Sequence, residues 1–165
     1  MTSRETVNLF IDNAAKAGAE PASVKDIGEM NRLLARILEG TSLIYCPGFT
    51  ERERAVEIPE DRRTGDHRTA AACIEEVFGA IAETGSLICS SHGGKTVQAG
   101  LLPAHHVAIV SADRVYEKLD DLFSSCGDSP PTNITLETGP SRTADIELTL
   151  TIGVHGPERL SIIVL

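Results

Sequence analysis

The sequence predicts an α/β fold built around a mostly parallel sheet. The 165 residues are 41% hydrophobic, which is enough for one well-buried core and too little for two. Only 4% are aromatic and Trp is absent, so the core must consist of Leu, Ile, Val and Ala, as in parallel sheets with short aliphatic strands. Apolar runs also alternate with amphipathic segments along the chain. We therefore expect one domain, with functional groups where strands give way to loops.

The first forty residues are typical of a helical segment. Residues 5–18 carry apolar side chains at helical spacing. A second amphipathic helix should follow Ser23 and end at Gly40. We expect this helical segment, residues 1–40, to precede a larger α/β unit over residues 41–165, with both in a single domain.

Short apolar runs after residue 40 predict strands at 42–46, 107–110, 133–136 and 160–165. The charged stretch 50–66 favours a solvated connection that could include one edge strand. Residues 69–78 fit either a helix or a strand followed by a helix. A helix should follow Ser111, which offers an N-cap. The last strand should be pinned inside the sheet.

Charge and cysteine content exclude several classes of partner. A net charge of −9 disfavours nucleic acid or an anionic membrane surface as the main partner. No run approaches the roughly 18 apolar residues of a membrane span, and the N-terminus lacks a signal peptide, so the expected location is the cytoplasm. Cysteines at 46, 73, 89 and 126 match no metal or iron–sulfur spacing. We expect them to be small buried hydrophobes and expect no metal site in the chain.

Polar and flexible residues gather between Gly139 and Pro157, as is typical of a pocket lining. A helix is expected to open at Ser141, where backbone N–H groups and the Arg142 guanidinium would receive a carboxylate or phosphate. Alternatively, a hydroxyl caps that helix and Arg142 pairs with a nearby carboxylate. The predicted ligand-binding residues of this stretch are Gly139, Ser141, Arg142, Thr143, Asp145 and Gly156, with Glu147 as a further carboxylate.

Two residues are candidate catalytic groups. His155 lies between Gly153-Val154 and Gly156-Pro157 and could act as a general acid or base, or could be a structural histidine in a tight loop. Glu83 follows an apolar run and could be a nucleophile toward an activated acyl group, or an ordinary turn residue. Thr84, Gly85 and Ser86 follow it and complete the predicted ligand-binding set.

The order apolar, Glu-Thr-Gly, Ser occurs at 80–86 and again at 135–141. We expect the two glycine-containing turns to meet in space and to form one cavity for small anions. His105 and His106 directly precede an apolar run, and two successive strand residues cannot point to one face, so a dihistidine metal site there is not expected.

Four blocks resemble the LUD domain, the lactate-utilisation protein C family. They are A-I-A-E-T-G-S-L at 80–87, L-L-P-A-H-H-V-A-I-V at 101–110, G-P-S-R-T-A-D-I-E at 139–147 and G-V-H-G-P at 153–157. The resemblance covers roughly residues 40–165 and implies a three-layer α/β sandwich like those of NagB, ribose-5-phosphate isomerase and CoA transferases. It also implies a role in oxidising L-lactate to pyruvate in bacteria, together with iron–sulfur partner proteins that carry the clusters, while this chain binds no cofactor.

Three functions follow as hypotheses. The first is a non-redox subunit of a lactate-oxidising iron–sulfur complex that binds a small anionic ligand such as lactate, pyruvate, a nucleotide phosphate or CoA. The second is a stand-alone enzyme, either an acyl or CoA transferase that uses Glu83 or an isomerase similar to those acting on sugar phosphates. The third is a regulatory module in which Arg142 and His155 hold an anion without reaction. The sequence leaves open whether the chain is an enzyme, and a homodimer is an ordinary expectation.

Overall fold

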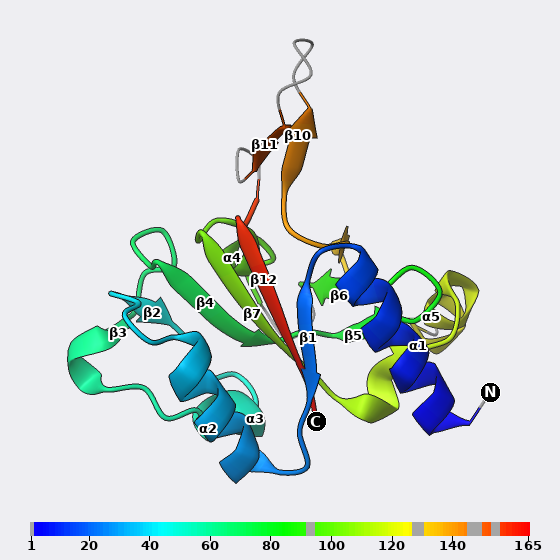
Figure 1. The fold of residues 1–165 in the computed structure, drawn as a ribbon, viewed down its shortest axis with the longest axis horizontal. Helices are drawn as coiled ribbons and strands as arrows, with labels where there is room; N and C mark the ends of the chain where they lie inside the picture. The colour runs from blue at the N-terminus through cyan, green and yellow to red at the C-terminus, as the bar shows by residue number, and fades with distance from the viewer. Residues whose placement is uncertain (1, 92–94, 127–130, 145–149, 153–155) are drawn as a thin grey trace.

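The computed structural model describes residues 2–91, 95–126, 131–144, 150–152 and 156–165 (Figure 1). Its central feature is a six-stranded, all-parallel sheet in the order β1-β12-β7-β4-β2-β3. The strands, in that order, are Glu20–Ser23, Arg159–Val164, His105–Val110, Ala72–Glu76, Ile44–Tyr45 and Arg63–Thr64. The predicted α/β class with a mostly parallel sheet is therefore confirmed.

A second, four-stranded sheet of mixed direction has the order β8-β5-β6-β9. Its strands, in that order, are Val115–Tyr116, Gly79–Ile81, Ser86–Ser90 and Ile134–Glu137. The sequence did not predict a second sheet. A further antiparallel pair, β10 (Arg142–Ala144) and β11 (Leu150–Ile152), extends away from the parallel sheet in Figure 1.

The described helices are α1 (Ser3–Lys16), α2 (Ile27–Ile37), α3 (Glu51–Arg54), α4 (Gln98–Leu101) and α5 (Leu119–Cys126), with 3₁₀ turns η1 (Glu60–Arg62) and η3 (Ala112–Arg114). The first two match the predicted helices. A capping box between Thr2 and Glu5 starts α1, and the Asp26 carboxylate accepts the Glu29 N–H at the start of α2. Among the described helices, none is both long and apolar enough to cross a bilayer.

The parallel sheet is covered by different elements on its two faces. Met30 of α2 belongs to a buried cluster with Ile74 and Ile109, on one face. Phe10 of α1 belongs to another with Ala108 and with residues of the mixed sheet. Because successive strand residues point to opposite faces, the neighbours Ala108 and Ile109 join different clusters. The mixed sheet and α1 therefore lie on one side of the parallel sheet, and α2 lies on the other.

Several strands match their predictions. Strands β2, β7, β9 and β12 lie at the predicted apolar runs, β3 is the edge strand that the charged stretch could include, and residues 72–76 form a strand. The final strand β12 lies between β1 and β7, so the last strand is pinned inside the sheet as expected.

One strand was missed, and two local predictions were wrong. Residues 20–23 form β1, and the sequence hides this strand because Pro21 disfavours a central strand; β1 is an edge strand, where Pro is tolerated. The predicted helix after Ser111 is divided into η3, β8 and α5. No helix opens at Ser141 either, because residues 142–144 form β10.

Candidate functional site

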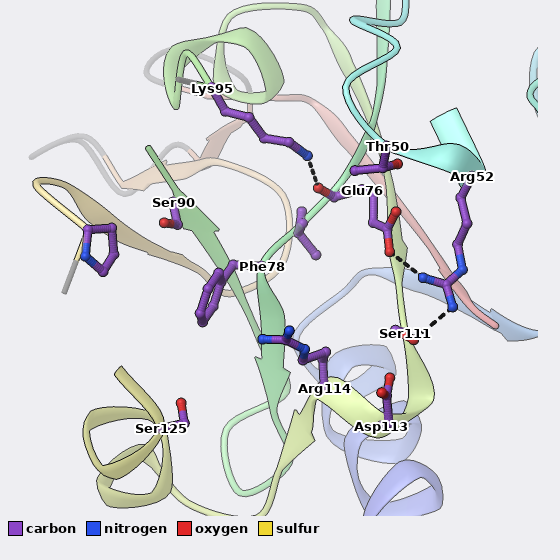
Figure 2. A pocket seen from close by; sticks show the side chains of 12 residues that line it. Thr50, Arg52, Glu76, Phe78, Ser90, Lys95, Ser111, Asp113, Arg114 and Ser125 are labelled. Carbon is purple, nitrogen blue, oxygen red and sulfur yellow. Dashed lines mark hydrogen bonds and ion pairs between the residues drawn. The ribbon is translucent and has the colours of Figure 1, made fainter. Parts of the chain in front are cut away.

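A pocket of 540 Å³ lies at the carboxyl ends of the central parallel strands (Figure 2). Residues that follow β2 (Thr50 and Arg52), end or follow β4 (Glu76 and Phe78) and follow β7 (Ser111–Arg114) contribute to its walls. In the sheet, β2 and β4 are neighbours, with the edge strand β3 on the far side of β2 and β7 on the far side of β4. The chain therefore leaves β2 toward β3 and leaves β4 in the opposite direction, toward β7. Such a divergence of connections opens a crevice at the carboxyl edge of a parallel sheet, which is where ligands of open α/β folds bind.

A fully buried carboxylate, Glu53, joins the segments behind this pocket. Its Oε2 accepts the N–H groups of Phe49 at 2.7 Å and Thr50 at 3.3 Å, while its Oε1 accepts the Glu76 N–H at 2.7 Å and Lys95 Nζ at 2.9 Å. The side chain of Glu53 is 0% exposed. A buried carboxylate is tolerated when donors satisfy both oxygens and a cation balances its charge. Glu53 therefore holds three separate chain segments together at the pocket.

Arg52 and Lys95 reach the pocket from these segments and are paired within the protein. Arg52 donates to Glu76 Oε1 at 2.5 Å and to Ser111 Oγ at 2.9 Å, and Lys95 also donates to the Glu76 carbonyl oxygen (Figure 2). These contacts orient both cations, and they also neutralise part of their charge.

Arg114 differs from the other two pocket cations. Its guanidinium lies over the Phe78 ring, 5.5 Å from the centroid, which is a cation–π distance. Among the described residues, no carboxylate or carbonyl accepts a hydrogen bond from this guanidinium. Arg114 therefore offers its donors to whatever enters the pocket.

A second ionic cluster is buried between the two sheets. His106 of β7 is fully buried, with Nδ1 at 2.7 Å from Glu137 Oε2 of β9 and Nε2 at 3.3 Å from Glu75 Oε1 of β4. Within the described part of the chain, Glu75 Oε1, Glu137 Oε1 and His106 Nε2 lack a hydrogen-bond partner. A Cβ on Gly100 of α4 would lie 2.3 Å from Glu75 Oε1 and 2.6 Å from His106 Nε2. Only a glycine lets α4 approach this cluster so closely.

The two carboxylates keep His106 protonated. Burial alone would lower the pKa of His106, but the charge of Glu137, its hydrogen bond and the proximity of Glu75 outweigh burial and raise the pKa to about 10. The neighbouring His105 points to the other face and hydrogen-bonds to Ser161 Oγ at 2.9 Å. Burial and the charge of Arg159 lower the pKa of His105 to about 4. The two histidines therefore face opposite sides of the sheet, as expected, and differ in charge at neutral pH.

The two predicted glycine turns do lie close together. The hydroxyl oxygens of Thr84 and Ser86 are 2.7 Å apart, and Ser86 Oγ is 2.7 Å from Thr138 Oγ1. A Cβ on Gly85 would lie 2.3 Å from the Ala14 backbone nitrogen of α1, and both turn glycines have positive φ. The close approach of α1 thus explains the first glycine without any ligand.

The second turn also packs against the end of α1. A Cβ on Gly139 would lie 2.2 Å from the Ala17 carbonyl oxygen, and one on Gly18 would lie 2.1 Å from an Arg142 guanidinium nitrogen. Arg142 is thus at the carboxyl end of a helix, where the helix dipole favours a cation. The Ser141 N–H donates to the Pro157 carbonyl oxygen at 2.8 Å, next to Gly156.

The remaining predicted site residues are placed as follows. Glu83 is exposed, and its Oε1 accepts the Leu119 N–H at the start of α5 at 3.0 Å, which fits the turn alternative. Thr143 is in β10. His155, Asp145 and Glu147 lie outside the described residues. None of the described ones lines the 540 Å³ pocket, so a ligand-binding role for the glycine turns stays a prediction.

The pocket residues were missed because the stretch 50–54 looks like an ordinary solvated run of charges. One signal was present: Thr50 and Glu53 have the spacing of a capping box, which the structure forms at α3. A strand-end Glu76 and an isolated Lys95 carried no comparable signal.

Three of the four cysteines are buried, as predicted. Cys46, Cys73 and Cys89 lie in the core; burial raises the pKa of all three thiols, that of Cys46 to about 11. The side chain of Cys126 is outside the described set. Among the residues whose placement is described, no group of three or more His, Cys, Asp or Glu could hold a metal ion.

Comparisons with known proteins agree on one family. The family model of the LUD domain matches residues 56–165. The lactate utilization protein C of Halalkalibacterium halodurans is 33% identical over 121 residues, which cover 70% of this chain and 49% of that protein. The protein of the same name from Macrococcus caseolyticus is 36% identical over 90 residues, 51% of this chain and 39% of that one. The chain thus spans about half or less of the length of these relatives.

A solved structure extends the likeness to the whole chain at the level of fold. The crystal structure of a DUF162 family protein from Deinococcus radiodurans superposes with a TM-score of 0.72 at 22% sequence identity, covering 99% of this chain and 98% of that one. The family model covers β4 and β7, two of the strands whose ends contribute to the pocket. The chain therefore belongs to the LUD domain family.

Proposed function

We propose that this chain acts in lactate utilisation and binds an anionic small molecule in the pocket at the carboxyl edge of its parallel sheet. The proposal includes a role as a subunit without a redox centre, which assists the oxidation of L-lactate to pyruvate while partner proteins carry iron–sulfur clusters. The family and the relatives named lactate utilization protein C support the first part. One observation supports the site: the Arg114 guanidinium lines the pocket, and it donates no hydrogen bond to a carboxylate of the described residues.

The pocket is a better candidate for the anion than the glycine turns. Three cationic side chains, Arg52, Lys95 and Arg114, line it together with the acidic Glu76 and Asp113, in a chain whose net charge is −9. A guanidinium grips a carboxylate or phosphate through two parallel N–H groups. In the glycine turns, by contrast, Arg142 lies against the end of α1.

The site is tested by thermal unfolding and calorimetric titration with pyruvate, lactate and inorganic phosphate. Wild type should be stabilised by at least one of them, because a ligand at a hundred times its Kd adds about 2.7 kcal/mol to the free energy of unfolding. Arg114→Gln should weaken that binding about tenfold, the equivalent of one charge-assisted hydrogen bond. Arg36→Gln, an exposed substitution on α2, should leave affinity unchanged. Equal affinities in both variants would refute the site.

The subunit role has a separate test. The full protein, tagged and purified from its native cell under anaerobic conditions, should carry iron–sulfur proteins whose clusters are reduced when L-lactate is added. Incubation with acyl-CoA and intact-mass measurement examines the transferase alternative: an adduct in wild type that Glu83→Gln abolishes would favour it over the subunit role. Binding without either result would favour a regulatory module.

A further inference from the structure

We propose that the pocket accepts an anion carrying a flat aromatic ring, with Phe78 and Arg114 as the residues that recognise the ring and the anionic group. This inference rests on the proposed anion site and specifies its ligand class. Lactate and pyruvate would then be too small to be the ligands that fill this pocket.

The first argument is size. A volume of 540 Å³ lies within the range of about 300–1,000 Å³ that is usual for ligand pockets. Ligand pockets of this size usually bury most of the surface of a much larger organic molecule than a three-carbon acid. A three-carbon acid would leave most of the pocket to water, so only its carboxylate would gain from the site.

The second argument is the division of the pocket into two chemically distinct walls. Arg52, Glu76 and Ser111 form one wall, in which Arg52 donates a hydrogen bond to each of the other two (Figure 2). Phe78 projects into the middle of the pocket from the other side (Figure 2). Part of the Phe78 side chain packs on the small cluster of Ile81, Ile88 and Leu122, and part of it remains accessible.

The third argument is the geometry of Arg114. Because its guanidinium lies over the Phe78 ring, 5.5 Å from the centroid, the ring and the donors are presented at one place in the pocket. Aromatic rings attract one another in offset or edge-to-face contacts, and a planar guanidinium also stacks on aromatic faces. A molecule that joins a conjugated ring to a carboxylate or phosphate can therefore engage both residues at once. A neutral ring would leave the donors of Arg114 unused, and a small anion would gain nothing from the Phe78 ring.

The experiment compares two pairs of probes by calorimetric titration of the whole chain: adenosine 5′-monophosphate with ribose 5-phosphate, and phenylpyruvate with pyruvate. Within each pair the anionic group is kept and the ring is removed. At least one ring-bearing probe should bind about tenfold more tightly than its counterpart. Arg114→Gln should weaken both members of that pair about tenfold.

Substitutions of Phe78 make the test specific. Phe78→Leu should lower the affinity of the ring-bearing probe about threefold to tenfold and leave that of its counterpart unchanged, because an aliphatic side chain lacks the aromatic contact. Phe78→Tyr should restore the affinity, which also controls for misfolding. Phe123→Leu, which replaces a 62% exposed aromatic on α5 outside the pocket, should have no effect.

The outcomes separate this inference from the proposed function. Ring-free probes that bind as tightly as ring-bearing ones, with Arg114→Gln still weakening them, would overturn the aromatic ligand and leave the anion site intact. Binding of all probes that is insensitive to Arg114→Gln, or no binding at all, would overturn both.

Discussion

Glu75 and Glu76 are neighbours on β4, yet they belong to two buried ionic clusters of opposite character. The Glu76 side chain faces the pocket and pairs with Arg52, and its N–H binds Glu53, which four N–H donors satisfy. Glu75 faces the mixed sheet and meets His106, in a cluster where three polar atoms lack a hydrogen-bond partner among the described residues. The pleat of one strand thus separates a satisfied cluster from an unsatisfied one.

The difference shows what each cluster depends on. Around Glu53, backbone N–H groups supply most of the stabilisation, so the carboxylate is held even where the Lys95 side chain is partly accessible. Around His106, two carboxylates depend on a single imidazolium for their charge. Removing that one cation leaves two uncompensated charges in the interior, whereas removing the Glu53 charge leaves only a cation that is close to solvent.

The largest effect is therefore expected for His106→Gln. Glutamine can hydrogen-bond to one carboxylate but cannot balance charge, so the free energy of unfolding in urea should fall by about 3–5 kcal/mol, the usual cost of breaking a buried ion pair. His105→Gln is the matched control in the same strand; it loses one neutral hydrogen bond to Ser161 and should cost about 1 kcal/mol. Equal losses in the two variants would contradict the contrast between them.

The same cluster predicts a dependence on pH. Because folding raises the pKa of His106 from about 6.5 to about 10, its protonation stabilises the folded state fully below pH 6.5, and this contribution is lost as the pH rises toward 10. The difference in the free energy of unfolding between wild type and His106→Gln should therefore shrink steadily over that range. Urea titrations at several pH values measure it, and subtraction cancels the other titrating groups. A difference independent of pH would mean that His106 is not the group that titrates.

Long apolar runs made part of this architecture predictable. The strands at 107–110 and 160–165 come from runs that are aliphatic apart from Ser161, as is typical of a buried strand or helix, and both were predicted. The mixed sheet was not, because β8 has two residues and β5 has three, which is too short for any periodicity to appear. The pairing of these short strands depends on contacts between residues that lie far apart in the sequence.

The same limit applies to the site. The sequence predicted Gly85 as a ligand-binding residue, but Gly85 packs against Ala14 of α1, and no local pattern identifies that contact. Glu51 and Glu53 are both glutamates in one charged run, yet the first is exposed and the second is buried. The distinction arises from donors on Glu76 and Lys95, which tertiary structure brings to Glu53. Sequence reasoning therefore found the glycine turns and missed the pocket.

A smaller effect than that of His106→Gln is expected for Glu53→Gln. The amide keeps one acceptor oxygen but presents N–H groups to backbone donors that a carboxylate oxygen accepted, and it loses the charge opposite Lys95. Hydrogen bonds to a charged group contribute about 1.5–3 kcal/mol, so the free energy of unfolding should fall by about 2–3 kcal/mol. The control Glu57→Gln, an exposed change in the same connection, should keep the free energy of unfolding within about 0.5 kcal/mol of wild type.

Glu53→Gln should also weaken ligand binding in the pocket, because Glu53 ties Thr50 and Lys95 to the end of β4. His106→Gln, by contrast, should lower stability alone and leave ligand binding unchanged at temperatures where the variant remains folded. Loss of binding in His106→Gln without loss in Glu53→Gln would mean that the buried cluster, and not the satisfied one, shapes the pocket.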